Sequence, residues 1–406
     1  MKKLLALAYA ALLPLSTSLY AADFAGQREQ VLVLGSLTNP PALHAAEGFA
    51  KDGGLRAIYF DALPWKGQPT RVFAWLGLPA KGAGKVPGVV LVHGGGGTAF
   101  KEWVQKWNQH GYAAISIAVE GQTSEPGAKK SSGRQGWQRH DWPGPERAGI
   151  YADSAEPLAE QWMYHAVADT VLAHSLLCSL PEVDAGKVGL MGISWGGVIT
   201  STVIGIDPRF AFAIPTYGCG HLFDADNQYG RALGSNTLYR EVWDPMVRMA
   251  RAQMPVLWFS WPEDSHFPLD CQAACYRAAP GPHMVALIPG LHHGHGSAYN
   301  PPDSYAFADS VVREGQPWCV QTGVKNTRGV ASVEFSATKP LERAVLISTT
   351  GTGFTGQRKW LEAPARLEQR GATWRVAAAL PAGTTAWFVN VRSATLAASS
   401  DYQTVE

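Results

Sequence analysis

The sequence lacks an excess of charge of either sign and has few charged residues overall. Charged residues make up 17% of the 406 residues, and the formal net charge is +1. The missing basic excess argues against a nucleic-acid-binding surface, and the missing acidic excess argues against a disordered acidic chain. Because 46% of the residues are hydrophobic, we expect a globular protein with a substantial core.

Cysteine is also scarce, and its spacing argues against a regular metal or disulfide framework. There are five cysteines, so at least one stays unpaired within a monomer. No C-x-x-C pattern occurs, and we therefore expect neither a zinc site nor a redox site. Cys271 and Cys275 lie in a predicted helix, on one face, where a bridge between them would constrain little.

Long apolar runs are absent except at the amino terminus. Lys2 and Lys3 follow Met1, the apolar run Leu4–Leu15 comes next, and Ala21 and Ala22 are small. This order predicts a cleaved signal peptide over residues 1–21, and hence a secreted or periplasmic protein. A membrane anchor is the alternative, but the run is short for a spanning helix and Pro14 interrupts it. We expect no stable membrane insertion.

The rest of the chain alternates stretches typical of strands and helices. Several strand candidates are continuous apolar runs, which are typical of a mostly parallel sheet covered by helices on both faces. The sequence therefore predicts a doubly wound α/β domain over residues 22–322. The strands are expected at Leu55–Leu63, Thr70–Leu78, Gly88–His93, Ala113–Ala118, Val188–Met191, Phe212–Pro215, Val256–Phe259 and Met284–Ile288, and the helices at Phe100–His110, Leu158–Leu180, Val198–Ile206 and Cys271–Ala279.

Two segments depart from this alternation. Residues 120–151 are rich in Gly, Pro, Lys and Arg and are too long for an ordinary connection, which indicates either a lid or a surface excursion. Over residues 323–406, short β-rich segments are separated by turn residues such as those at 350–353 and 381–383. This spacing predicts a small antiparallel β-sandwich after the α/β domain.

The strongest chemical signal is the pattern Gly192-Ile193-Ser194-Trp195-Gly196. An apolar strand precedes it and a helix-compatible run follows it, as a G-x-S-x-G nucleophile elbow requires. A sharp strand-to-helix turn would lift the Ser194 hydroxyl above the sheet, and the two glycines would let strand and helix approach closely. Ser194 is therefore the candidate nucleophile, and it needs a histidine base that is oriented by a carboxylate.

The acid is expected in a loop after a later strand, because the chain order in this arrangement is Ser, acid, His. The loop WPEDSHFPLD follows an apolar strand and supplies Asp264 as the candidate acid, with Glu263 as the alternative. Asp270 directly precedes a predicted helix, so we expect it to be the N-cap of that helix instead.

The base is expected after the next strand, because neighbouring strand ends bring their loops together. That strand leads into GLHHGHGSAYN, where His293 is the candidate base and His292 and His295 are the alternatives. The His-x-His spacing lacks the additional carboxylate and helix ligands of common hydrolytic zinc sites, so we expect no metal.

A run of four glycines after an apolar strand predicts an oxyanion hole. The motif HGGGG begins at His93. The hole would combine the N–H of Trp195 with the N–H of Gly95, or of Gly96 as the alternative. The glycine run matches neither G-x-x-x-x-G-K-[ST] nor a G-x-G-x-x-G with an acidic partner, which argues against a phosphate-binding loop.

Together these motifs resemble the α/β-hydrolase superfamily, and within it the branch of dienelactone hydrolases and acetyl xylan esterases. The matching pieces are PGVVLVHGGGGTAFKEWV, VDAGKVGLMGISWGG, MPVLWFSWPEDSHFPLD and LIPGLHHGHGSAYNPPDSYAFADS, over roughly residues 55–315. The resemblance implies ester hydrolysis through an acyl-enzyme by Ser194, Asp264 and His293, often on acetylated carbohydrates. The tail after Gly323 looks like the β-sandwich modules of secreted relatives.

We therefore predict a serine carboxylic-ester hydrolase that needs no metal or organic cofactor and acts on a small-molecule or carbohydrate ester. Trp137, His140, Trp142 and Tyr217 are candidate substrate-binding residues, because aromatic faces can stack on sugar rings; lid packing would use the same residues. Two other functions stay open: a peptidase or amidase of the prolyl-oligopeptidase type, and a non-catalytic carbohydrate-binding protein. Such peptidases usually carry a large propeller, for which this chain has no room.

Overall fold

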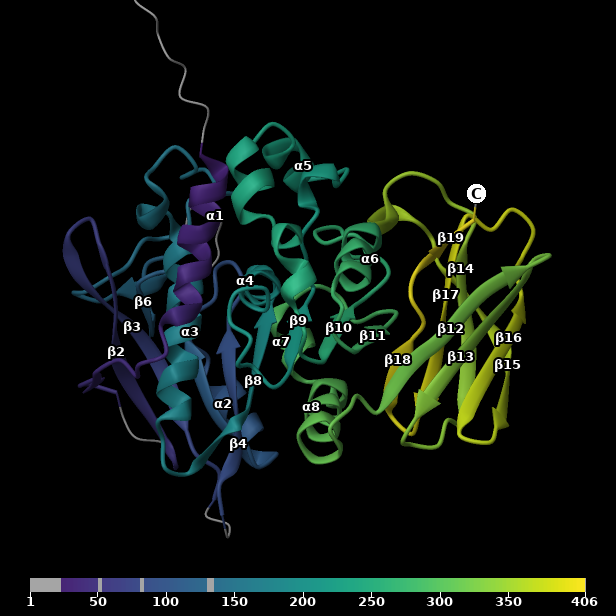
Figure 1. The fold of residues 1–406 in the computed structure, drawn as a ribbon, viewed down its shortest axis with the longest axis horizontal. Helices are drawn as coiled ribbons and strands as arrows, with labels where there is room; N and C mark the ends of the chain where they lie inside the picture. The colour runs from purple at the N-terminus through teal and green to yellow at the C-terminus, as the bar shows by residue number, and fades with distance from the viewer. Residues whose placement is uncertain (1–22, 50–52, 81–83, 130–134, 406) are drawn as a thin grey trace, which may run out of the picture.

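The computed structural model describes residues 23–49, 53–80, 84–129 and 135–405 (Figure 1). The predicted signal peptide lies outside these residues. Within them, no helix is long and apolar enough to cross a membrane. The helices are α1 (Phe24–Leu32), α2 (Lys101–Gln109), α3 (Trp162–Cys178), α4 (Trp195–Val203), α5 (Gln228–Leu233), α6 (Leu269–Ala278), α7 (His295–Tyr299) and α8 (Pro302–Glu314). The strands are β1 (Leu43–Ala45), β2 (Leu55–Trp65), β3 (Gln68–Gly77), β4 (Val86–Val92), β5 (Ala113–Ile117), β6 (Gln122–Pro126), β7 (Trp137–Arg139), β8 (Val183–Ile193), β9 (Ala213–Thr216), β10 (Val256–Ser260), β11 (His283–Leu287), β12 (Cys319–Thr327), β13 (Val330–Ala337), β14 (Arg343–Thr349), β15 (Leu361–Arg370), β16 (Thr373–Ala379), β17 (Ala386–Ser393), β18 (Leu396–Ser399) and β19 (Gln403–Thr404).

The central sheet runs in the order β2-β3-β5-β4-β8-β9-β10-β11. β2 and β3 pair antiparallel at one edge, and β3 pairs antiparallel with β5. From β5 onward all neighbouring strands are parallel. The apolar run of β4 is almost completely buried, as expected for a strand that is covered on both faces. The predicted doubly wound, mostly parallel sheet is therefore confirmed.

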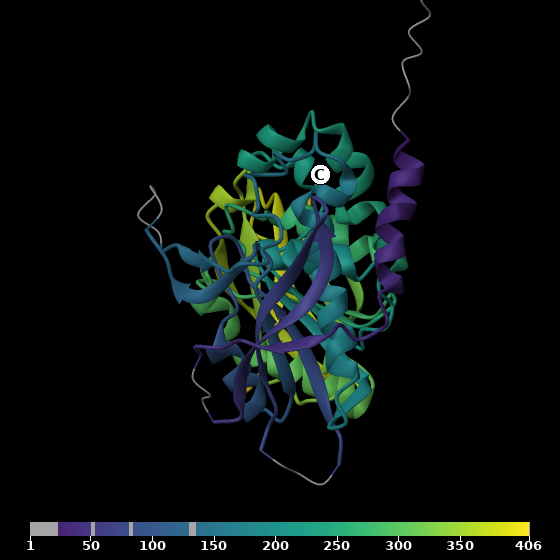
Figure 2. The same cartoon turned by 90° about the vertical axis from the view of Figure 1, so that its left-hand side faces the viewer.

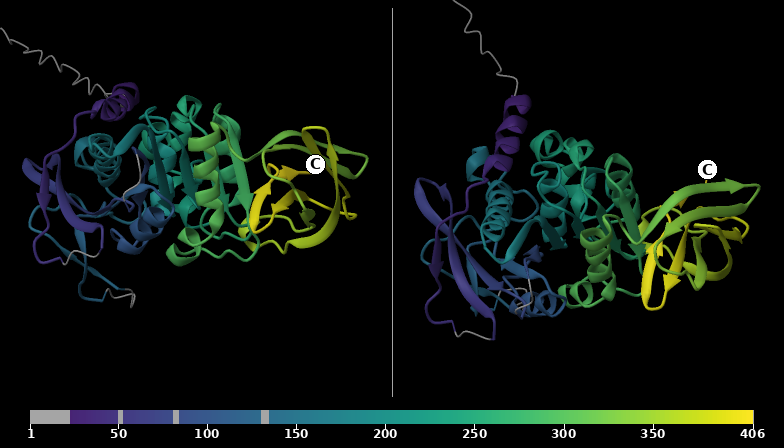
Figure 3. Two further views of the ribbon diagram at one scale, coloured as in Figure 1. Left: turned by 90° about the horizontal axis from the view of Figure 1, so that it is seen from below. Right: turned by 60° about the horizontal axis from the view of Figure 1, so that its bottom comes forward.

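Helices cover both faces of this sheet (Figure 3). α3 and α4 contact each other and pack on β8. α2 and α8 also contact each other, through Trp107 and Tyr305, whose ring centroids are 4.6 Å apart. α3 is buried on nearly every side, which explains why its sequence WMYHAVADTVLAHSLLC shows little amphipathic pattern.

One helix boundary differs from the prediction. α6 begins at Leu269 with Pro268 as its N-cap, so Asp270 lies in the first helical turn and the predicted N-cap is wrong. Pro268 has no N–H to donate and suits a helix start. Asp270 accepts a hydrogen bond from Thr355 Oγ1 at 3.4 Å, and an acidic residue in a first turn is favourable against the helix dipole.

The C-terminal strands form two antiparallel layers, as predicted for a β-sandwich. Their order is β18-β17-β14-β15-β16-β13-β12. β15 belongs to both layers, because its first half pairs with β14 and its second half pairs with β16. Buried side chains such as Phe335 and Phe388 fill the space between the layers.

The sandwich is joined to the central sheet by main-chain pairing, which no sequence pattern indicated. β18 lies antiparallel to β11, with Ser399 opposite Val285 (Figure 1). The Leu287 N–H donates to Ser399 Oγ at 2.7 Å, and the Asn390 side chain donates to the Leu287 carbonyl at 2.8 Å. Strand pairing therefore continues without a break from β1, which pairs with β2, through β11 and β18 to β12 at the far end of the sandwich.

The excursion at residues 120–151 begins as the hairpin β6–β7 (Figure 2). The chain then returns along the β2–β3 edge of the sheet. There the ring of His140 contacts the ring of Tyr59 at 5.1 Å, and the Trp142 carbonyl accepts the Arg71 N–H at 2.9 Å.

Candidate active site

Ser194 occupies the turn between β8 and α4 in a strained backbone conformation, with φ 59° and ψ −117°. A Cβ on Gly192 would stand 2.0 Å from the Gly196 carbonyl oxygen, and a Cβ on Gly196 would stand 2.2 Å from the Val92 carbonyl oxygen. Only glycine therefore permits this close approach of strand and helix. The Ser194 N–H donates to the Thr216 carbonyl at 2.8 Å and fixes the turn.

Three side chains from separate loops form one hydrogen-bonded chain. Ser194 Oγ lies 2.9 Å from His293 Nε2, and His293 Nδ1 lies 2.9 Å from Asp264 Oδ2. The three residues follow β8, β11 and β10, so the carboxyl ends of parallel strands bring them together. Asp264, rather than the alternative Glu263, meets the imidazole.

The Asp264 carboxylate is completely buried and accepts hydrogen bonds at both oxygens. Oδ1 accepts the N–H groups of His266 at 2.8 Å and of Phe267 at 2.9 Å. Oδ2 also accepts the Trp261 indole N–H at 3.2 Å. These donors fix the carboxylate so that Oδ2 faces the Nδ1 of His293.

Aromatic rings hold the His293 imidazole in place. The rings of His266 and Tyr217 lie 4.6 Å and 4.7 Å from it, and Phe267 lies at 5.8 Å. The Tyr217 hydroxyl donates to the His292 carbonyl at 2.8 Å. Burial raises the pKa of Tyr217 well above its ordinary value, so this hydroxyl stays protonated and keeps donating. His292 thus contributes its main chain to the loop.

His295, the other alternative base, contacts the glycine loop instead of Ser194. Its Nε2 accepts the Gly94 N–H at 2.9 Å. Burial lowers the pKa of His295 to about 4, so the ring is neutral at neutral pH and can accept this bond. The rings of Phe100 and Trp103 pack on it at 5.2 Å and 5.7 Å.

Two further side chains hold the carbonyls of the glycine loop. The Trp137 indole N–H donates to the Gly96 carbonyl at 2.9 Å, and the Gln122 amide donates to the Gly97 carbonyl at 3.0 Å. Both side chains come from the hairpin of the excursion. The excursion therefore supports the loop directly.

The bracing leaves main-chain donors available next to the nucleophile. Among the described residues, the N–H groups of Gly95, the alternative Gly96 and Trp195 have no hydrogen-bond partner. The loop packs directly on the elbow, because a Cβ on Gly94 would stand 2.8 Å from the Ser194 Cβ. Such donors can hold the negative oxygen that develops on a carbonyl group when Ser194 attacks it.

The four predicted substrate-binding residues fall into two groups. Tyr217 packs on His293 and Trp137 holds the glycine loop, so the structure brings both to the site. His140 and Trp142 lie on the β2–β3 edge instead, where Trp142 stacks under the Arg71 guanidinium at 4.3 Å. The structure does not bring these two to Ser194.

Two residues near the site carried no functional signal in the sequence. Gln122 follows the carboxyl end of β5, a position that favours functional residues in this kind of sheet. Arg147 comes from the end of the excursion, and its guanidinium stacks on the Trp195 ring with 4.7 Å to the centroid. No motif marks Arg147, because only the folded excursion brings it there.

One group of residues among those described could hold a metal ion. The ligand atoms of Asp264, His266 and His293 lie within 4.8 Å of one another. Two of these residues already belong to the hydrogen-bonded chain that ends at Ser194, so a metal there would compete with that chain.

The fold and the elbow define the class of this protein as an α/β-hydrolase. Two acetyl xylan esterases of known structure share the fold. The enzyme from Paenibacillus sp. R4 is 21% identical with a TM-score of 0.51, covering 68% of this chain and 90% of its own. Acetyl xylan esterase 1 from Thermoanaerobacterium sp. JW/SL YS485 is 17% identical with a TM-score of 0.52, covering 67% and 89%.

The family comparison agrees with this class. Residues 56–254 match the model of the acetyl xylan esterase (AXE1) family. The resemblance to the branch of acetyl xylan esterases is thereby confirmed over this segment, which contains the glycine loop and the elbow, and it supports a hydrolase of the esterase type. No curated protein matches the chain.

Proposed function

We propose that this protein is an exported serine esterase that removes acetyl groups from carbohydrate esters through an acyl-enzyme. The observation that carries the proposal is the hydrogen-bonded chain Ser194–His293–Asp264, with links of 2.9 Å each, beside main-chain N–H groups that have no partner within the part of the chain that the structure describes. The family match over residues 56–254 supports an ester as substrate, and the names of the two structural relatives suggest an acetylated sugar.

In the proposed reaction each residue of the site has one role. His293 Nε2 takes the proton from Ser194 Oγ as that oxygen attacks the ester carbonyl, and Asp264 steadies the imidazolium through Nδ1–H. The N–H groups of Gly95 and Trp195 hold the tetrahedral oxygen. His293 then returns the proton to the leaving sugar oxygen, and water deacylates Ser194 by the same route.

Aromatic rings around Ser194 favour a short acyl group. Trp195 contacts Tyr229 at 5.7 Å, Tyr229 contacts Phe267 at 5.1 Å, and Phe267 contacts His293 at 5.8 Å. These rings are buried and close-packed, so a long acyl chain would have to displace them. An acetyl group fits this setting better than a fatty acyl group.

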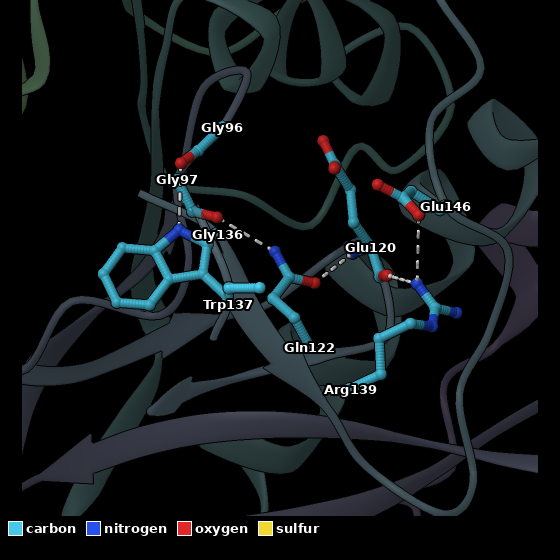
Figure 4. Close-up of a pocket in the computed structure, with 9 residues that line it drawn as sticks. Gly96, Gly97, Glu120, Gln122, Gly136, Trp137, Arg139 and Glu146 are labelled. Carbon is cyan, nitrogen blue, oxygen red and sulfur yellow. Dashed lines mark hydrogen bonds and ion pairs between the residues drawn. The ribbon is translucent and has the colours of Figure 1, made fainter. Parts of the chain in front are cut away.

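A cavity beside the glycine loop favours a sugar as the leaving group. Its volume is about 200 Å³, and Gly96, Gly97 and Trp137 line one side (Figure 4). Glu120, Arg139 and Glu146 line the other side. Carboxylates and a guanidinium bind hydroxyl groups well, and an indole face suits a sugar ring. Trp137 stays a candidate sugar contact on this basis.

Export is proposed from the amino-terminal sequence. Two lysines, the apolar run Leu4–Leu15 and the small residues Ala21 and Ala22 have the order of a cleaved signal peptide. A periplasmic or secreted location would place the enzyme where polymeric carbohydrate esters occur.

The test compares the wild-type protein with Ser194→Ala. We expect the wild type to release acetate from acetylated xylan and p-nitrophenyl acetate, with less activity on long-chain esters and peptide amides. Ser194→Ala should lower turnover on the order of 10⁴-fold or more. Ser235→Ala, at an exposed serine, should behave as the wild type. Retained activity in a folded Ser194→Ala protein, or turnover of peptide amides alone, would refute the proposal.

A further inference from the structure

Arg147 lies against both residues whose N–H groups face the tetrahedral oxygen in the proposed mechanism. Its guanidinium carbon is 4.7 Å from the centroid of the Trp195 ring. A Cβ on Gly95 would stand 3.0 Å from Arg147 Nη2 and 3.0 Å from Trp195 Cδ1. The guanidinium therefore sits where the glycine loop meets the first turn of α4.

The guanidinium is held in this place by several contacts. Its Nε lies 3.4 Å from Glu120 Oε1, and the exposed fractions of the two side chains are 19% and 8%. Nη1 donates to the Gly149 carbonyl, and the Trp162 ring lies on the guanidinium at 5.9 Å. Nε faces the Glu120 carboxylate whereas Nη2 faces Gly95, so the positive side of this pair is turned toward the glycine loop, and little water reaches it to weaken its field.

We infer that Arg147 is a positioning residue for the oxyanion hole. It fixes Gly95 and Trp195 by packing between them, and its charge favours the negative oxygen that develops on the ester carbon. The inference rests on the proposed function, in which that oxygen forms. Because the charge acts on the tetrahedral state and not on the bound ester, its removal should lower kcat and leave KM nearly unchanged.

The experiment compares Arg147→Met, Arg147→Lys and the matched control Arg71→Met. Arg71 makes the same two kinds of contact away from the site, with Trp142 at 4.3 Å and Asp61 at 3.3 Å. With p-nitrophenyl acetate, Arg147→Met should lower kcat roughly 10- to 100-fold with KM within about twofold. Arg147→Lys keeps the charge and should recover most of kcat. Arg71→Met should stay within about twofold of the wild type.

Two further measurements distinguish an effect of the Arg147 charge on the oxyanion from a general loss of folded structure. A trifluoromethyl ketone forms a tetrahedral oxyanion on Ser194, so its inhibition constant should rise in Arg147→Met by the same factor as kcat/KM falls. The rate at which a fluorophosphonate labels Ser194 should fall in the same variant, and this readout does not depend on the natural ester.

Each outcome decides the inference. Unchanged kcat in Arg147→Met, an equal loss in Arg147→Lys, or an equal loss in Arg71→Met would overturn it. If Arg147→Met does not fold, the folded Arg147→Lys decides, because loss of kcat there excludes a role for the charge. Absence of labelling in the wild type would overturn the proposed function, and with it this role. Normal labelling of the wild type that stays normal in Arg147→Met would overturn only the role of Arg147.

Discussion

On one side of Ser194 the glycine loop at residues 94–97 is held mainly by side chains, namely His295, Gln122 and Trp137. On the other side Asp264 is held by two main-chain N–H groups, by the Trp261 indole N–H and by packing from the 3₁₀ turn Thr355–Gln357 of the C-terminal sandwich. A Cβ on Gly356 would stand 2.5 Å from the Asp264 carbonyl oxygen. The glycine loop therefore depends on side chains that form hydrogen bonds with it. The acid loop depends instead on close packing against Gly356, where there is no room for a methyl group.

The largest expected effect is loss of stability in acid, which concerns the glycine-loop side. Burial lowers the pKa of His295 to about 4 and the pKa of His93 to about 3. Because both values lie below the ordinary 6.5, the unfolded chain binds these protons first as the pH falls. The stabilisation is complete above pH 6.5 and decreases below it, by about 3 kcal/mol for each histidine at pH 4.5.

The variant His295→Gln isolates one of these contributions. Glutamine can still accept the Gly94 N–H but does not titrate. In urea unfolding at pH 7.5 and 4.5, His295→Gln should lose about 3 kcal/mol less than the wild type on acidification. Ser235→Ala, at an exposed serine that does not titrate, should lose as much as the wild type. An identical pH dependence of the wild type and His295→Gln would contradict the role given to His295.

The second effect concerns the acid side. In Gly356→Ala the added methyl group must displace the Asp264 main chain, because the clash at 2.5 Å is with backbone. A shift of the acid by about 1 Å should lower kcat roughly 100-fold, and overpacking should cost about 1–3 kcal/mol of the free energy of unfolding. The measurements are p-nitrophenyl acetate kinetics and thermal unfolding.

Gly323→Ala is the matched control for this change. A Cβ on Gly323, also in the sandwich, would meet its nearest atom at 3.7 Å. This variant should keep wild-type activity and stability. Equal kcat in Gly356→Ala and Gly323→Ala would show that the sandwich does not position the acid.

The smallest effect returns to the glycine-loop side. Trp137→Phe keeps an aromatic ring but removes the indole N–H that donates to the Gly96 carbonyl at 2.9 Å. One such bond is worth about 1 kcal/mol, so kcat/KM for p-nitrophenyl acetate should fall roughly fivefold. Trp142→Phe should have no effect on this reaction, and an equal loss in both variants would contradict the bracing role of Trp137.

Sequence patterns predicted the parts of the site that follow strands. Ser194 comes directly after β8, and Asp264 and His293 lie in the loops that follow β10 and β11; the sheet topology fixes where such loops meet. The predicted strands also match the structure closely; β10, for example, was expected at Val256–Phe259 and ends one residue later, at Ser260. The hydrophobic pattern of the strands and the position of a residue after a strand are therefore enough to predict those parts of the site that the sheet topology arranges.

The contacts that were missed depend on folded segments without a regular pattern. Three histidines stand close together in the sequence, and only the structure separates the base candidate His293 from His295, which holds Gly94. Arg147 reaches Trp195 only after the excursion has folded back. The error at Asp270 has a local cause, because α6 has Pro268 as its N-cap and begins at Leu269, two residues before a helix capped by Asp270 would begin.

The pairing of β18 with β11 has a consequence for how the chain matures. Without β18, β11 would present a row of unpaired main-chain groups at the end of a large sheet, which is a template for association with other chains. Its partner strand β18, with Ser399 opposite Val285, follows β12–β17 in the chain, so β11 is synthesised well before the strand that covers it. The edge of the central sheet at β11 therefore stays uncovered until β18 has been synthesised and pairs with it.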